Sequence, residues 1–291
     1  MLRKIIKYHT PVWLYKFFSF IWNIPVTVKR WFKKPTNNFT SREFRNIEVG
    51  PYNFTILLDP NNGYVDNKIY LDGEWEVPLT NKIVSTLKDK DGIFIDVGAN
   101  IGYFTLLSGL VLKGKGEVHG YEPISYIFKQ LQTSIKKNDL NNVKVFNLAC
   151  GSEDKYTEIN IFRENVGSSS LLSETKSFDM VEQVKVVRLD DRYQDKEKII
   201  LIKIDVEGYE IEVLKGAQKI LTEIGPEIVF EFNPYRLADI YGQDKVCEVL
   251  YFLQESGYGI YTLRGEPITN FQTLAENQIR LRESVELCCK K

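Results

Sequence analysis

Short strand-like segments alternate with longer helix-like segments through the middle of the chain. The pattern predicts strands at 93–97, which begins with the apolar run Ile93-Phe94-Ile95, at 116–121 and at 143–148, and helices at 102–112 and 125–137. A strand-helix-strand-helix-strand order predicts an α/β fold, a mostly parallel sheet with helices on both faces.

The same alternation continues toward the C-terminus. It predicts strands at 157–162, 183–188, 199–204 and 227–232, helices at 210–222 and 236–256, and two antiparallel strands at 258–263 and 279–282. The core pattern starts near residue 91, so we expect the main domain to span residues 91–291.

An N-terminal extension is predicted before this domain, over residues 43–90. Residues 47–58 and 68–71 flank the turn-prone segment 59–63, which is typical of a β-hairpin or a pair of short strands. A helix over 75–87 then leads into the first core strand.

Residues 1–42 form a third part, a basic arm rich in aromatic residues. Its apolar stretch, 12–28, is interrupted by Lys16, Asn23 and Pro25, so it is too short to cross a hydrocarbon core of ~30 Å. No small-residue cleavage site follows, which disfavours a secretory signal. Two interpretations stay open: residues 1–34 lie on an anionic membrane surface, or they pack as a helix on the protein itself or on a second subunit.

Charge and cysteine content narrow the possible partners. Residues 1–42 carry nine Lys/Arg and no acid, and the remaining residues carry 29 Lys/Arg against 39 Asp/Glu. An acidic body disfavours a nucleic-acid partner. Four cysteines without a C-x-x-C pair, with only two histidines in the chain, disfavour a zinc site or a disulfide framework. We therefore expect free thiols and a cytoplasmic protein, with the membrane's inner face as a possible peripheral location.

The turn after the first core strand carries candidate chemistry. Asp96-Val-Gly-Ala-Asn-Ile-Gly102 joins a strand to a helix start, where a glycine loop brings backbone N–H groups close to a ligand. The same pattern also serves as a plain corner between a strand and a helix. It lacks the lysine of a phosphate-binding P-loop and the spacing of a dinucleotide fingerprint. We expect a cofactor without a pyrophosphate.

Acidic residues lie at or just after the ends of several predicted strands. They are Asp96, Glu122, Asp205 with Glu207, and Glu231. The carboxyl ends of parallel strands share one rim of the sheet, where open α/β folds bind their ligands. An acid about 20 residues beyond a glycine turn can accept both hydroxyl hydrogens of a ribose. An acidic cleft with a ribose-binding acid suits a cofactor that has a ribose and a positive charge. S-adenosylmethionine is such a cofactor.

Several of these segments resemble the FkbM-type S-adenosylmethionine-dependent methyltransferases, over about residues 70–285. The segments are Asp96 to Thr105, Tyr121-Glu122-Pro123, Ser169-Ser170-Leu171, Ile202 to Glu210, and Val213 to Ala217. The resemblance implies a Rossmann-like class I methyltransferase fold, with a seven-stranded sheet whose last strand is reversed, after the N-terminal extension.

The resemblance also implies roles for individual residues. Asp96, Gly98, Asn100 and Gly102 would surround the amino-acid part of the cofactor, Glu122 would hold the ribose, and Ala149 would lie near the adenine. Glu76 would close over the site, and Ser170 is included among the cofactor-binding residues. Residues 1–42 lie outside the resemblance.

Methyl transfer to a hydroxyl requires a base near the donor end of the cofactor. Asp205 is the first candidate and Glu207 the second, with Lys203 on the same strand face to orient a carboxylate. In an alternative interpretation, Asp205 only contacts the cofactor and Glu207 caps the next helix. Asp205, Glu207 and Glu231 could also hold Mg²⁺, but we do not expect a metal site.

The predicted function is therefore O-methylation of a sugar, glycan or secondary-metabolite hydroxyl. A catalytically inactive methyltransferase fold that serves as a scaffold at a membrane surface is the alternative. Asn233-Pro234-Tyr235 resembles a motif of enzymes that methylate nucleic-acid amines, but it lacks a second proline and follows the fifth strand rather than the fourth.

Overall fold

The computed structural model describes residues 42–60, 63–161, 180–193 and 197–291. All elements below belong to one compact unit, Ser41–Lys291. The predictions for the basic arm and for Ser170 fall almost wholly outside the described residues. Among the described residues, no helix is long and apolar enough to cross a membrane.

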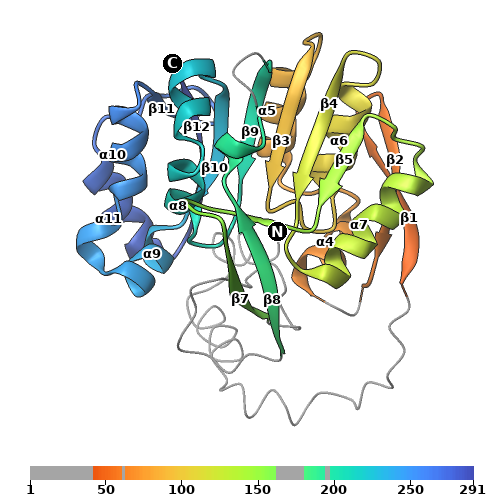
Figure 1. The fold of residues 1–291 in the computed structure, drawn as a ribbon, viewed down its shortest axis with the longest axis horizontal. Coiled ribbons are helices and arrows are strands. Elements are labelled where there is room, and N and C mark those ends of the chain that lie inside the picture. The colour runs from red at the N-terminus through yellow and green to blue at the C-terminus, as the bar shows by residue number, and fades with distance from the viewer. Residues whose placement is uncertain (1–41, 61–62, 162–179, 194–196) are drawn as a thin grey trace, which may run out of the picture. The chain divides into compact units, whose positions relative to one another are not determined.

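A seven-stranded sheet forms the centre of the unit (Figure 1). Its spatial order is β11 (Gly259–Thr262), β12 (Val285–Lys290), β10 (Glu227–Phe232), β9 (Ile199–Ile204), β3 (Gly92–Val97), β4 (Gly116–Tyr121) and β5 (Val143–Phe146). Neighbouring strands are parallel except where β12 runs antiparallel to β10 and to β11. The predicted seven-stranded, mostly parallel sheet with a reversed last strand is confirmed.

Helices cover both faces of this sheet. One face carries α4 (Tyr64–Asp72), α5 (Val77–Leu87), α6 (Tyr103–Val111) and α7 (Ser125–Lys137), and the other carries α8 (Glu210–Lys215), α9 (Pro234–Tyr241), α10 (Glu248–Glu255) and α11 (Phe271–Leu281). Successive strand residues point to opposite faces. Accordingly Phe94 packs into the core with α4–α7, and its neighbour Ile95 packs into the core with α8–α11.

The N-terminal hairpin lies earlier in the chain than predicted. Strands β1 (Glu43–Val49) and β2 (Tyr52–Leu58) pair antiparallel around a tight turn in which Gly50 has φ 55°. Strand β2 packs against α6 and α7. The prediction of a strand at 68–71 is wrong, because these residues belong to α4, which ends where Gly73 turns left-handed and donates its N–H to Ile69.

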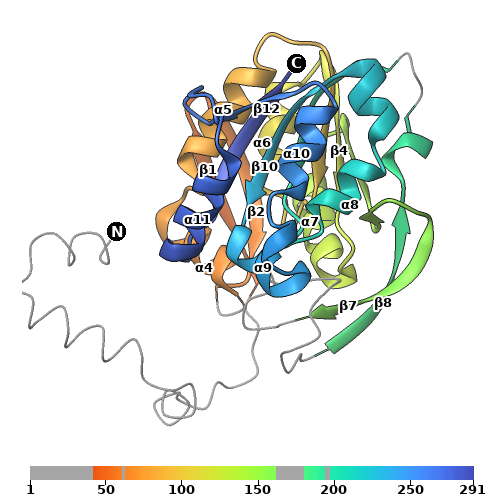
Figure 2. The same cartoon turned by 90° about the vertical axis from the view of Figure 1, so that its left-hand side faces the viewer.

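A smaller sheet extends from the carboxyl side of the core (Figures 1 and 2). It contains β6 (Ala149–Cys150), β7 (Lys155–Ile161) and β8 (Met180–Val187), in the order β6-β8-β7. Strands β7 and β8 are antiparallel and form a projecting arm, and β6 pairs with β8 in parallel. The strands predicted at 157–162 and 183–188 are confirmed, with shifted ends.

Three C-terminal predictions need correction. The helix predicted at 210–222 comprises α8 and a π-helical turn, Ile220–Ile224. The helix predicted at 236–256 is broken at Gly242, where φ is 89°, into α9, a 3₁₀ turn (Gln243–Lys245) and α10. The prediction of a strand at 279–282 is wrong, because residues 279–281 form the end of α11 and residue 282 follows it. This helix is capped at its start by the Asn270 side chain, which accepts the Thr273 N–H at 2.9 Å.

Candidate active site

The glycine turn lies between the carboxyl ends of β3 and β9. Gly98 has φ 78°, and a Cβ there would lie 1.9 Å from the carbonyl oxygen of Asp205, so only glycine allows this approach. Asn100 also has a positive φ of 50°, and its side chain accepts from Ile101 N–H at 2.8 Å. Gly102 begins α6 with φ 96°. The turn therefore depends on left-handed backbone at positions 98, 100 and 102 and lies over the carboxyl ends of the central strands.

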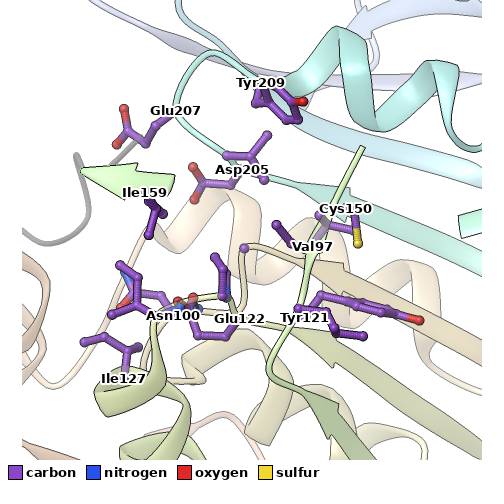
Figure 3. A pocket seen from close by; sticks show the side chains of 16 residues that line it. Val97, Asn100, Tyr121, Glu122, Ile127, Cys150, Ile159, Asp205, Glu207 and Tyr209 are labelled. Carbon is purple, nitrogen blue, oxygen red and sulfur yellow. Dashed lines mark hydrogen bonds between the residues drawn. The ribbon is translucent and has the colours of Figure 1, made fainter. Parts of the chain in front are cut away.

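A first cavity opens beside this turn (Figure 3). Its walls are mostly apolar and come from the segment after β4, from α7 and from β6 and β7; they include Ile124, Ile127, Leu148, Ala149, Cys150 and Ile159. Polar side chains from Asn100, Glu122, Asp205 and Glu207 line it as well. A mostly apolar cavity with a few convergent polar groups is the usual form of a small-molecule site.

Glu122 is the polar anchor of the first cavity. Its carboxylate accepts Asn100 N–H at 2.9 Å and Ile124 N–H at 2.8 Å, one on each oxygen. Burial raises the pKa of this carboxyl to about 7, although the two backbone donors act in the opposite direction. Each oxygen keeps a further lone pair that a ligand hydroxyl can use.

A second cavity is lined by the other side of the glycine turn. It shares Gly98, Asn100, Asp205 and Glu207 with the first cavity. Aromatic and acidic side chains characterise its other walls: Tyr64, Trp75, Tyr103, Phe104, Glu76 and Glu231. The rings of Tyr64 and Trp75 meet edge to face at 6.0 Å. The two cavities thus meet at the turn and differ in composition.

Lys203 places a buried positive charge under this junction. Its Nζ lies 3.4 Å from an oxygen of Asp96, 3.4 Å from one of Asp205 and 3.5 Å from the carbonyl oxygen of Gly98. The side chain is 3% exposed. Burial alone would lower the pKa of the ammonium, but the carboxylates of Asp205, Asp96 and Glu76 outweigh burial and raise it. Lys203 therefore stays charged and fixes the Asp205 carboxylate.

Carboxyl groups crowd the second cavity. Burial, with the nearby Asp205 charge, raises the pKa of Glu76 to about 8 and that of Glu231 to about 7, while Ser284 donates to Glu231 at 2.6 Å. Burial also raises the pKa of Glu207 well above its ordinary value, against the effect of Arg236, whose guanidinium lies 3.4 Å away. The pKa values of Glu76 and Glu231 therefore lie near neutral pH.

Three of these acids have the spacing of a cation site. One carboxylate oxygen each from Asp205, Glu207 and Glu231 lies within 4.8 Å of the others. Lys203, Arg236 and Ser284 already contact the three acids. Acid clusters without a metal ion are common, so this geometry alone does not make a metal site.

The structure brings most predicted site residues together. Gly98, Asn100, Asp205 and Glu207 line both cavities, Glu122 and Ala149 line the first, and Glu76, Gly102 and Lys203 line the second. Asp96 lines neither: it is fully buried, accepts from the Thr105 hydroxyl at 2.6 Å and contacts Lys203. Ser170 lies outside the described residues.

Sequence reasoning missed the apolar and aromatic walls. Ile127 and Ile159 line the first cavity, and Tyr64 and Trp75 line the second. An apolar residue at a ligand wall has the same sequence signature as one in the core. Sequence reasoning also missed Glu210, a buried acid that accepts the Gly208 N–H at 3.0 Å and shapes the loop after β9. Its position inside the family motif at 202–210 could have indicated this role.

Two curated methyltransferases are similar to this chain. "Methyltransferase 1" of Beauveria bassiana (strain ARSEF 2860) is 25% identical over 193 residues, covering 58% of this chain and 73% of the relative. "Methyltransferase sdnD" of Sordaria araneosa is 28% identical over 171 residues, covering 47% of this chain and 64% of the relative.

Among solved structures, the chain is similar to the methyltransferase FkbM of Methylobacillus flagellatus KT. That match has 21% identity and a TM-score of 0.44, and it covers 68% of this chain but only 43% of the other.

A family model, the methyltransferase FkbM domain, matches residues 96–260, which is more than half of the chain and includes the glycine turn, Glu122 and the loop after β9. The chain therefore belongs to the FkbM family of S-adenosylmethionine-dependent methyltransferases.

Proposed function

We propose that this methyltransferase methylates a hydroxyl oxygen of a sugar, a glycan or a secondary metabolite. The observation that carries the proposal is the junction of the two cavities, where Asp205 and Glu207 face both of them above the buried Lys203 ammonium. One cavity suits a nucleoside, and the other suits an acceptor with several hydroxyl groups. Family membership favours this enzyme over the alternative of an inactive scaffold.

The first cavity fits the adenosine half of the cofactor. Its apolar walls, which include Ala149, can sandwich a flat base, and Glu122 offers free lone pairs to a ribose diol. Gly98, Asn100 and Gly102 would surround the amino-acid half along the turn, with Asp96 supporting them from beneath through Lys203. Glu76, on the opposite wall of the second cavity, would close over that half.

Asp205 is the proposed base. The bound cofactor supplies a methyl group on a positively charged sulfur; an acceptor oxygen forms the new bond to that carbon, and the electron pair of the broken bond stays on sulfur. The hydroxyl proton then needs a carboxylate at the junction, which Lys203 orients on Asp205 from 3.4 Å. Glu207 is the second candidate, held by Arg236.

The second cavity supports a ring-shaped, polyhydroxylated acceptor. The aromatic pair Tyr64 and Trp75 offers flat apolar surface near its wall, and Glu76 and Glu231 offer hydrogen-bond acceptors to hydroxyl groups. Holding such an acceptor in line with the methyl group and away from water supplies much of the acceleration in reactions of this type.

Comparison of small molecules and released glycans from a strain with and without the gene would test the acceptor class. Mass spectrometry should find a hydroxylated product that is lighter by one methylene group in the deletion strain. The purified enzyme should restore the missing group when given S-adenosylmethionine, and the Asp205→Asn variant should not. Loss of a methyl group from nitrogen or from a carboxylate ester would contradict O-methylation of a hydroxyl.

A further inference from the structure

One carboxylate lies beside buried apolar residues on the inner face of the projecting arm. In the antiparallel pairing of β7 and β8, Ile159 lies opposite Glu182, and side chains of opposed residues share a face. Ile159, Ile161, Val184 and Val186 on that face are all buried. Glu158, on the other face of β7, is exposed. A charged residue among buried apolar neighbours requires a specific partner.

The partner of Glu182 is the N-terminus of α7. Glu182 accepts the Ser125 N–H at 3.1 Å and also the Ser125 hydroxyl. Helix α7 has 13 residues, and its own N-cap residue, Ile124, provides no capping side chain. Glu182 therefore caps α7 from 57 residues away in the chain, where a negative charge is also favoured by the helix dipole.

The contact joins two walls of the first cavity. Glu122 and Ile124 lie just before Ser125 and line the cavity, and Ile159 lines it from the arm. Figure 3 shows Ile159 on its strand and Ile127 on α7, on the side of the cavity where Asn100 lies. Asn147 also holds the segment before α7, because its amide donates to the carbonyl oxygens of Glu122 and Pro123 at 2.9 and 2.7 Å.

We propose that Glu182 is a positioning residue for the cofactor: its bonds to Ser125 hold the β7–β8 arm against α7, so that Ile159 closes the adenosine cavity. This inference rests on the proposed function, since it places adenosine in the first cavity. Glu182 does not line either cavity, so its effect passes through Ile159 and the segment before α7. It should change cofactor affinity and leave the reacting groups in place.

Calorimetric titration of Glu182→Ala with S-adenosylhomocysteine, and separately with 5′-methylthioadenosine, tests this role. Because loss of these bonds would release Ile159 from the cavity wall, we expect both dissociation constants to rise roughly tenfold. An equal loss of affinity for 5′-methylthioadenosine, which lacks the amino acid, would show that the effect concerns binding of the adenosine half. The turnover number at saturating S-adenosylmethionine should change less than about threefold, whereas general misfolding would lower it.

Ser125→Pro provides an independent variant that removes both donors. Proline is favoured at the first helical position, and Ile124 already has the extended backbone (φ −78°, ψ 113°) that a following proline requires. We expect it to match Glu182→Ala in affinity, and the double variant to lose no more than either single one. Glu182→Gln, which keeps one acceptor, should lie between them and the wild type.

Glu158→Ala is the matched control, since it removes an exposed acid from the other face of the same arm. Its affinity should equal that of the wild type. If the wild type binds both ligands and Glu182→Ala binds them equally well, Glu182 has no positioning role. If the wild type fails to bind 5′-methylthioadenosine while binding S-adenosylhomocysteine, the adenosine assignment itself is wrong, and with it the proposed function of this cavity.

Discussion

The two cavities that meet at the glycine turn differ in the side chains with which they could hold a ligand. The first has apolar walls, and its anchor, Glu122, is fixed by two backbone N–H groups. The second combines aromatic rings with acids whose proton affinities depend on one another and on Lys203. Shape set by the backbone suits a constant cofactor, and a coupled set of charges suits a step in which a proton must move. The difference indicates which substitutions should affect binding and which should affect turnover.

Asp205→Asn should have the largest effect, and on turnover. The amide keeps the shape of the junction but cannot accept the acceptor's proton, and general-base catalysis contributes about 10²–10⁴-fold. We expect a loss of turnover number in that range in a methyl-transfer assay, with cofactor affinity by calorimetry still measurable. The control is Asp89→Asn, an exposed acid distant in the chain. A variant with more than a tenth of the wild-type rate would transfer the role to Glu207.

The pH dependence of cofactor binding should report Glu122. Burial raises the pKa of its carboxyl to about 7, and ribose hydroxyl groups bind the ionised form better. Affinity for 5′-methylthioadenosine, which has no titrating amino acid, should therefore increase roughly tenfold between pH 6 and pH 8. In Glu122→Gln the binding should be weaker and independent of pH in this range. An unchanged pH dependence in that variant would show that another group controls binding.

The acidic residues at the carboxyl rim of the sheet were predictable from the sequence, but the residues that form the cavity walls were not. Asp96 lies at the end of β3, and Glu122 and Asp205 directly follow β4 and β9; parallel strands bring their carboxyl ends together. The burial of Asp96 beneath the turn was not evident, because it depends on the register that places Asp96 opposite Lys203. Ile159 reaches the cofactor cavity through an arm outside the main sheet, a tertiary placement that apolar periodicity does not encode.

The fold shows the same division. Strands β3, β9 and β10 were predictable because each contains a run of at least three apolar residues. Helix α11 was missed although Phe271, Leu274 and Ala275 stand at helical spacing; only Phe271 and Ala275 are buried in it, and polar residues separate the apolar ones. Its start is fixed by a local cap at Asn270, a signal that short-range capping analysis could have used.

Glu76→Gln should reveal the charge coupling in the second cavity as a stability effect. An unfolded chain releases this proton near pH 4.5, but burial beside Asp205 raises the pKa of the folded group to about 8. Between these values the folded state holds more protons, so stability falls as pH rises and the loss is complete above about pH 8. The variant should therefore melt higher than the wild type at pH 9, by about 2–4 °C for each kcal/mol, and equally at pH 4. Glu74→Gln, an exposed neighbour, should show no such difference, and a shift of equal size at both pH values would contradict the coupling.

Removal of divalent metal should have the smallest effect, which makes it a sharp test of how the second cavity balances its charges. The oxygens of Asp205, Glu207 and Glu231 are close enough to hold a cation. The buried Lys203 ammonium already lies 3.4 Å from Asp205, and the Arg236 guanidinium lies 3.4 Å from Glu207. If these cations supply the compensation, dialysis against a chelator should leave the methyl-transfer rate within about twofold of its starting value, and added Mg²⁺ should not raise it. A rate that the chelator abolishes and Mg²⁺ restores would mean that the three acids bind a metal, and that Lys203 orients a ligand of that metal rather than a free base.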